Sequence, residues 1–277
     1  MHQPNHLEEI HAVSDAPGYP AARHEFLLRR LHSLAGLIPV GVFLIFHLAT
    51  NATIVLDKPG TFYQERVDQI HALGPLLKTV EMVFIFIPLA FHAGLGVKMW
   101  LQGAPNTSHY PYGGNIRYML QRVTGVIALL FILVHLWQMH WLGDWLPQGG
   151  LFDATHAPGT TAWILQHYAV WAGPVYLVGI LCAVFHLANG VWTSLITWGV
   201  TIGPAAQRKA GYVCAAFGLA LALAGTSSLW GFMRFGKPVE PKKVHEQLSG
   251  FRVQGSAEER GEATVRTGTW ESANVRK

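Results

Sequence analysis

Five long apolar segments constrain the fold of this chain more than any other feature. Each segment has about 20 residues or more, which is enough for a helix to cross the hydrocarbon core of a bilayer. Inside hydrocarbon every backbone amide needs an internal partner, so such segments fold as helices. The sequence therefore predicts an all-α integral membrane protein built as a bundle of five transmembrane helices. The predicted spans cover about residues 31–55, 75–101, 118–142, 163–197 and 210–232.

Composition agrees with this prediction. Of the 277 residues, 51% are hydrophobic and 13% are charged, whereas a soluble domain carries about 25% charged residues. A polar amino-terminal segment, residues 1–28, and a polar tail, residues 236–277, flank a five-helix domain at residues 29–235. The net charge of +4 is modest and gives no reason to expect a nucleic-acid partner. The two cysteines lie inside apolar segments, which indicates buried thiols.

Basic residues between the spans predict the orientation in the membrane. They precede the first span, lie in the connector between the second and third, and lie between the fourth and fifth. The positive-inside rule places these regions and the amino terminus in the cytoplasm, and five spans then place the carboxyl terminus outside. The remaining connections, including a polar loop at residues 56–74, face outwards. Pro39 and Pro88 predict kinks in the first two helices.

Four histidines lie deep inside apolar segments, one in each of the first four. A polar ring at that depth is costly unless it has a partner. At about 1.5 Å per helical residue, His47 and His135 fall at one level in the outer half of the membrane. His92 and His186 fall at a second level, in the inner half. The sequence therefore predicts two pairs of facing imidazoles at two depths.

Two stacked haems would use these two pairs, because a six-coordinate haem iron can take one neutral imidazole from each of two helices. A single membrane histidine is more often a packed hydrogen-bonding residue, and a zinc site would gather its ligands at one depth. A haem-free transporter would place carboxylates or lysines deep in the spans. Here only Lys78 and Glu81 come close, and both lie near the start of the second span.

Polar and aromatic residues at the inner ends of the predicted helices are candidates for binding haem propionates, since basic and hydrogen-bonding side chains suit a carboxylate. The alternative interpretation is that they mark topology and anchor the helices at the interface. These residues are Arg30, His32, Ser33, Gln121, Arg122 and Trp198.

Several motifs then identify a family. The segment from Arg29-Arg30-Leu31-His32 to Phe46-His47 resembles the first helix of the dihaem cytochrome b subunit of succinate dehydrogenases of the succinate:menaquinone type. The resemblance covers about residues 24–235 and leaves out the two polar tails. Further matching motifs are Phe91-His92-Ala93, Gln121-Arg122-Val123-Thr124-Gly125 and Phe185-His186-Leu187-Ala188-Asn189-Gly190.

The resemblance implies a function. Such a subunit anchors a flavoprotein and an iron–sulfur protein to the cytoplasmic membrane, without itself oxidising succinate. It passes electrons through an inner and then an outer haem b to a quinone, expected to be menaquinone. The family's axial ligands fall on His47 and His135 for the outer haem and on His92 and His186 for the inner haem. Cytochrome b subunits of fumarate reductases, or of other membrane dehydrogenases and hydrogenases, remain alternatives.

One departure and one weaker match concern proton chemistry. Some related fumarate reductases carry a glutamate two residues before the fourth ligand, where this chain has Val184. This chain therefore does not support that proton pathway. Those enzymes also have a glutamate near an outer quinol site, and Glu65 lies at a comparable offset from His92. The quinone-site candidates are Glu65, His71, His140 and Trp141.

Overall fold

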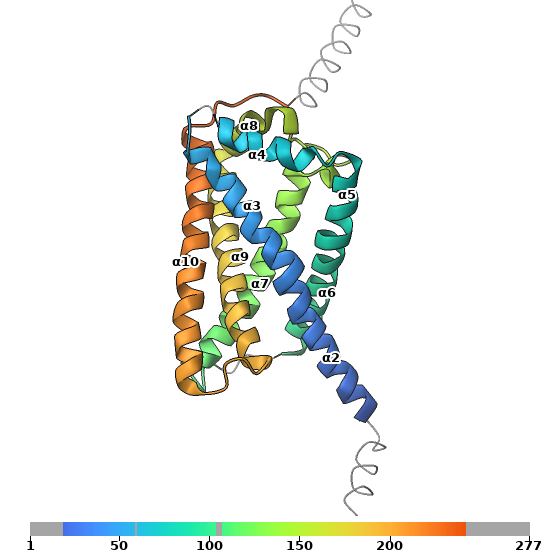
Figure 1. The fold of residues 1–277 in the computed structure, drawn as a ribbon, viewed down its shortest axis with the longest axis vertical. Coiled ribbons are helices and arrows are strands. Elements are labelled where there is room, and N and C mark those ends of the chain that lie inside the picture. The colour runs from blue at the N-terminus through green and yellow to red at the C-terminus, as the bar shows by residue number, and fades with distance from the viewer. Residues whose placement is uncertain (1–18, 59, 104–106, 242–277) are drawn as a thin grey trace, which may run out of the picture.

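The described chain is a bundle of long helices, as the apolar segments predict. The computed structural model describes residues 19–58, 60–103 and 107–241, and side chains from His24 onwards. These ranges are helical and contain no strand. Five helices are long and apolar enough to cross a membrane, which confirms the predicted number of spans (Figure 1). They cover His24–Val55, Pro75–Gln102, Gly113–Met139, Ala169–Thr197 and Pro204–Arg234.

The first span is one continuous rod of several helical segments. It combines α2 (Tyr19–Ala35), a π-helical turn (Gly36–Gly41), α3 (Val42–Ala52) and a short 3₁₀ turn (Thr53–Val55). Pro39 lies inside the π-helical turn. Proline has no amide hydrogen, and its ring crowds the preceding turn, so a local change to wider winding accommodates it. In Figure 1 this rod slants across the front of the bundle.

The second span repeats this solution. It consists of α5 (Pro75–Glu81), a π-helical turn (Met82–Phe86) and α6 (Ile87–Gln102). Pro88 lies in the first turn of α6, directly after the wide turn. Here too the change in winding occurs where the sequence predicts a kink.

The remaining spans form the densest part of the bundle. The third span is α7 (Gly113–Met139), and it packs along the fourth, α9 (Ala169–Thr197). The fifth, α10 (Pro204–Arg234), packs on α9 and α3. Gly225 permits this approach, since a methyl group there would lie 2.6 Å from Cγ2 of Ile180. Many large apolar side chains on the outside of the bundle are exposed, as expected of surfaces that face lipid.

The predicted polar loop at residues 56–74 is mostly helical. It contains α4 (Thr61–His71), whose first amides at Thr61 and Phe62 donate to the carboxylate of Asp57. Tyr63 is buried and packs edge-on against Phe232 of α10. Burial raises the pKa of the Tyr63 hydroxyl to about 12. The prediction failed because α4 has low overall hydropathy, and two buried side chains one turn apart suffice to dock it.

The fourth span is shorter than predicted. Residues 157–167 form a separate helix, α8 (Ala157–His167), and α9 begins only at Ala169. Most of α8 is buried, including Ala157, Ala162 and Ile164 at 0% exposure. A buried helix and a membrane helix are equally apolar, so hydropathy merged the two. Both α4 and α8 lie across one end of the bundle (Figure 1). Two further 3₁₀ turns, Trp141–Gly143 and Ala154–His156, lie between α7 and α8.

Gln64 joins α4 to the start of α8. Its amide nitrogen donates to the carbonyl of Ala154 at 2.7 Å, and its amide oxygen accepts from the amide of Ala157 at 2.9 Å. We expect Gln64→Ala to leave the buried Ala157 amide without a partner, at a cost of about 1–3 kcal/mol. Hydrogen exchange should then accelerate in the first turn of α8. Gln69→Ala, at an exposed position on α4, is the control, and equal exchange in both variants would contradict the assignment.

Candidate functional site

The structure brings the two outer-level histidines together. His47 on α3 and His135 on α7 have ring centres 5.7 Å apart, with their planes at 75°. Each ring is supported by a phenylalanine one turn earlier on its own helix, Phe43 at 5.3 Å and Phe131 at 5.9 Å. Tyr176 of α9 meets His135 edge-on at 5.8 Å. The pairing expected from depth is thus the pairing in the fold.

The inner-level histidines also face each other. His92 on α6 and His186 on α9 have ring centres 6.0 Å apart, with their planes at 86°. Nδ1 of His92 lies 2.9 Å from the carbonyl oxygen of His32, and Nδ1 of His186 lies 3.0 Å from that of Gln121. A carbonyl oxygen can only accept, so Nδ1 carries the proton in both rings. Nε2 is then the nitrogen left for a metal.

A glycine follows each of these carbonyls by one turn. A methyl group at Gly36 would collide with the His92 ring, and one at Gly125 would lie 2.8 Å from Cε1 of His186. Each inner histidine is therefore seated on the neighbouring span by one backbone acceptor and one glycine. Because a side chain at either glycine would displace the ring, the close approach of the helices requires the missing Cβ.

Spans one and three consequently carry the same set of parts in the same order. Each has a carbonyl that holds an inner histidine, a glycine under that histidine's ring, a phenylalanine, and an outer histidine one turn beyond. In span one these are His32, Gly36, Phe43 and His47, and in span three they are Gln121, Gly125, Phe131 and His135.

Both pairs fit the coordination of one metal by two imidazoles. A metal–imidazole bond is about 2.0–2.1 Å long, so two rings on opposite sides of one iron have centres about 6 Å apart. The observed separations are 5.7 and 6.0 Å. Within the described ranges no three His, Cys, Asp or Glu side chains converge on a common point. Each pair thus offers two protein ligands, which is the number that a haem iron takes.

Two ring nitrogens beside these pairs lack a partner in the described part of the chain. They are Nδ1 of His135 and Nδ1 of His32, and both are buried. Leaving a buried polar atom without a hydrogen bond costs about 1–3 kcal/mol. One orphaned atom belongs to the outer pair, and the other belongs to a ring stacked on His92 at 4.0 Å. Each of these two atoms therefore still has the capacity for one hydrogen bond.

A network of polar side chains surrounds His186 and Gln121. Nε of Arg117 donates to Oδ1 of the buried Asn189 at 2.9 Å, and Nδ2 of Asn189 donates to Oε1 of Gln121 at 2.8 Å. The Gln121 amide in turn donates to the carbonyl of His186 at 3.1 Å. The Arg117 guanidinium lies 3.7 Å from the ring centre of Trp192. These contacts tie α7 to α9 at the level of the inner pair.

The propionate candidates differ in the contacts that their side chains already make within the protein. Gln121 belongs to the network above. Arg122 donates to the carbonyls of Trp100 and Gly103, at the end of α6, where backbone acceptors lack helical partners. Both side chains therefore have structural tasks that the sequence did not reveal.

The other candidates lie on α2 and at the end of α9. The hydroxyl of Ser33 lies 2.7 Å from that of Ser194. The Arg30 guanidinium lies 5.1 Å from the ring centre of Trp198. These contacts place Arg30, Ser33 and Trp198 at one end of the bundle, on the side of the His92–His186 pair.

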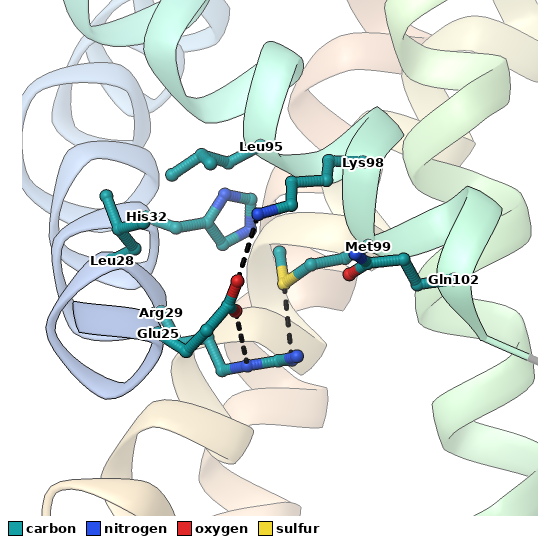
Figure 2. Close-up of a pocket in the computed structure, with 8 residues that line it drawn as sticks. All are labelled: Glu25, Leu28, Arg29, His32, Leu95, Lys98, Met99 and Gln102. Carbon is teal, nitrogen blue, oxygen red and sulfur yellow. Dashed lines mark hydrogen bonds and ion pairs between the residues drawn. The ribbon is translucent and has the colours of Figure 1, made fainter. Parts of the chain in front are cut away.

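His32 lines a small pocket between α2 and α6 (Figure 2). Its rim is charged, with Glu25 lying 2.9 Å from Lys98 and 3.9 Å from Arg29. The pocket therefore places two cations beside His32, whose ring stacks on His92. The lining residues are Glu25, Leu28, Arg29 and His32 from α2, and Leu95, Lys98, Met99 and Gln102 from α6.

The quinone candidates separate into two groups. Glu65 and His71 are exposed on α4. His140 and Trp141 follow the end of α7 and contact Glu81, the last residue of α5. In the sequence, Glu81 stands out only as a charge near the start of a span. An acidic residue inside an apolar segment was the available signal, but the contact between the ends of two spans could not be inferred from it.

Comparison with known proteins gives the chain a family. It matches none of the protein-family models with which it was compared. It is 34% identical over 213 residues to the succinate dehydrogenase cytochrome b558 subunit of Bacillus subtilis (strain 168). The match covers 77% of this chain and the full length of the relative. With its five membrane-spanning helices, the chain belongs to the family of succinate dehydrogenase cytochrome b membrane subunits.

Proposed function

We propose that this chain is the membrane-anchoring, quinone-reactive dihaem cytochrome b subunit of a succinate dehydrogenase complex. In this proposal it passes electrons from the iron–sulfur subunit through the inner and then the outer haem b to menaquinone. The observation that carries the proposal is the presence of two facing imidazole pairs, one from α3 and α7 and the other from α6 and α9. The relative's name, a cytochrome b subunit of succinate dehydrogenase, supports it.

Each histidine of the two pairs would bind one iron. His47 and His135 would hold the outer iron, and His92 and His186 would hold the inner iron. When bound, a haem iron accepts and releases one electron at a time. The carbonyls of His32 and Gln121 fix the tautomer and orientation of the inner rings. A hydrogen bond of this kind to the second ring nitrogen also raises the basicity of the nitrogen that binds the metal.

The propionates of the inner haem would meet the polar end of the bundle. His32 offers an unpartnered Nδ1, and Arg30, Ser33 and Trp198 lie at the same end. Gln121 and Arg122 would have to leave their helix contacts to take part. Since basic residues gather at this end, we assign it to the cytoplasm together with the amino terminus. The flavoprotein and iron–sulfur subunits would dock there, while the carboxyl terminus lies outside.

The proposal is tested on the purified native complex. We expect a flavoprotein and an iron–sulfur protein to co-purify with this chain, and we expect two b-type haems per chain that succinate reduces. A complex without a reduced-minus-oxidised b-type spectrum would exclude haem and favour a transporter. Partners other than those of succinate dehydrogenase would reassign the chain to another membrane oxidoreductase.

Two histidines five residues apart give a matched pair of variants. His135→Ala removes one of the outer imidazoles, so we expect the outer haem to be lost while the inner haem remains. His140→Ala, which removes a residue beyond the end of α7, should keep both haems. Haem content per chain and low-temperature optical spectra distinguish the two. If His140→Ala lost a haem and His135→Ala did not, the assignment would be wrong.

The contacts of Gly36 and Gly125 with the inner histidine rings lead to a second prediction. Alanine at a helical glycine ordinarily stabilises a helix by about 1 kcal/mol, but Gly36→Ala and Gly125→Ala should push the inner rings away from their carbonyls. We expect loss of the inner haem, or an altered electron paramagnetic resonance signal of it, with the outer haem unchanged. Gly114→Ala on α7 meets open space and is the control. An unchanged inner-haem signal in both variants would contradict the seating.

A further inference from the structure

We propose that Glu81 and His140 form the proton-donating site for a lipid-soluble quinone, at the end of the bundle that carries α4 and α8. This inference rests on the proposed function and names the residues that serve it. Nε2 of His140 lies 3.5 Å from Oε2 of Glu81, and the indole nitrogen of Trp141 donates to the same oxygen at 3.0 Å. A carboxylate from α5 is thus held by two groups from the end of α7.

The backbone sets which ring nitrogen of His140 faces the carboxylate with its proton. The amide of Leu142 donates to Nδ1 of His140 at 3.3 Å, so Nδ1 is the unprotonated nitrogen. The imidazole proton is therefore on Nε2, directed to Glu81. Burial lowers the pKa of His140 below its usual range, and the facing Glu81 carboxylate partly offsets this effect. The ring is therefore the donor in this contact, and the transferable proton is the one that the Glu81 carboxylate takes up from water.

Two further charged side chains act on this pair. Lys78 of α5 lies 4.8 Å from the ring centre of Trp141 and disfavours a positive charge on His140. Asp144 follows the 3₁₀ turn and favours it. The proton taken up by this pair therefore lies among opposing charges, at a place where both side chains remain 19% exposed. This exposure allows the pair to be reloaded from water.

The position suits a substrate that receives electrons from the outer pair. His140 is five residues after His135, which corresponds to about 7.5 Å of helix. The residues that surround Glu81 on α5 and the π-helical turn are apolar and exposed, with Leu76 at 56%, Met82 at 40% and Val83 at 49%. A polar acid–base pair bordered by side chains that face lipid fits a membrane-soluble ring with carbonyl oxygens. Phe86 adds an aromatic contact to His140, with ring centres 5.1 Å apart.

The chemistry balances with the groups that are present. Reduction adds two electrons and two protons to a quinone, so that both carbonyl bonds become single C–O bonds and two O–H bonds form. The electrons come from succinate through the partner subunits and this chain. The protons come one at a time from the Glu81 carboxyl, which takes each replacement from water, while Nε2 of His140 and the indole nitrogen of Trp141 donate hydrogen bonds to the carboxylate that is left. Such positioned proton donors contribute about 10²–10⁴-fold to rate.

The test uses the whole complex and a short-chain naphthoquinone. We expect Glu81→Gln and His140→Gln to lower kcat for succinate–naphthoquinone reduction about 100-fold, with haem content, haem reduction by succinate and phenazine-dye reduction unchanged. In the wild type the rate should fall as rising pH removes the proton that loads the pair, and this limb should vanish in Glu81→Gln and move in His140→Gln. Asp68→Asn, an exposed carboxylate on α4, is the matched control and should keep the wild-type rate and pH profile.

The outcomes separate this inference from the proposed function. A wild-type complex that lacks b-type haem, or that does not reduce naphthoquinone, contradicts the proposed function. A wild-type complex that does both, together with variants that keep the rate and the pH profile, contradicts only the assignment of Glu81 and His140. Because dye reduction and haem reduction report assembly, a variant that loses them is replaced by Glu81→Asp, for which we expect partial retention of kcat.

Discussion

Two hydrogen bonds from imidazole Nδ1 to backbone carbonyls hold the inner half of this molecule together. They fix the tautomer of His92 and His186, and they require α6 to lie close to α2 and α9 to lie close to α7. Close approach in turn requires Gly36 and Gly125. In a bilayer, where apolar contact alone gives helices little reason to associate, small residues and interhelical hydrogen bonds supply packing. The same contacts that orient His92 and His186 therefore also assemble the bundle.

The first four spans behave as two related hairpins. Span one holds the inner histidine of span two, span three holds that of span four, and spans one and three each carry an outer histidine. The outer pair is held differently, since Nδ1 of His135 has no partner in the described chain and the rings rest on Phe43 and Phe131. The fifth helix carries no histidine and packs on α3 and α9. The fifth helix therefore covers the side of the bundle where α3 and α9 lie.

The sequence predicts the five spans and the depth at which each buried histidine lies, because hydropathy and residue counts measure position along the membrane normal. It cannot predict contacts that depend on rotation or on loops. For that reason the sequence predicts a loop where α4 forms and one long span where α8 and α9 are separate helices, and it does not reveal that Arg122 binds the end of α6. The contact between Glu81 and His140 also arises where two spans end together. The role of the four histidines as axial ligands remains a prediction.

The backbone hydrogen bonds of His92 and His186 limit what amino-acid substitutions can change. The acceptors are backbone carbonyls of His32 and Gln121, so replacing either side chain leaves the acceptor itself in place. Substitution can move or tilt these helices, but it cannot delete the oxygen. The electronic character of the inner site is therefore insulated from point mutation at its two acceptors. Adjustment by sequence change must act through the surrounding side chains, of which Asn189 and Arg117 are the best connected to His186.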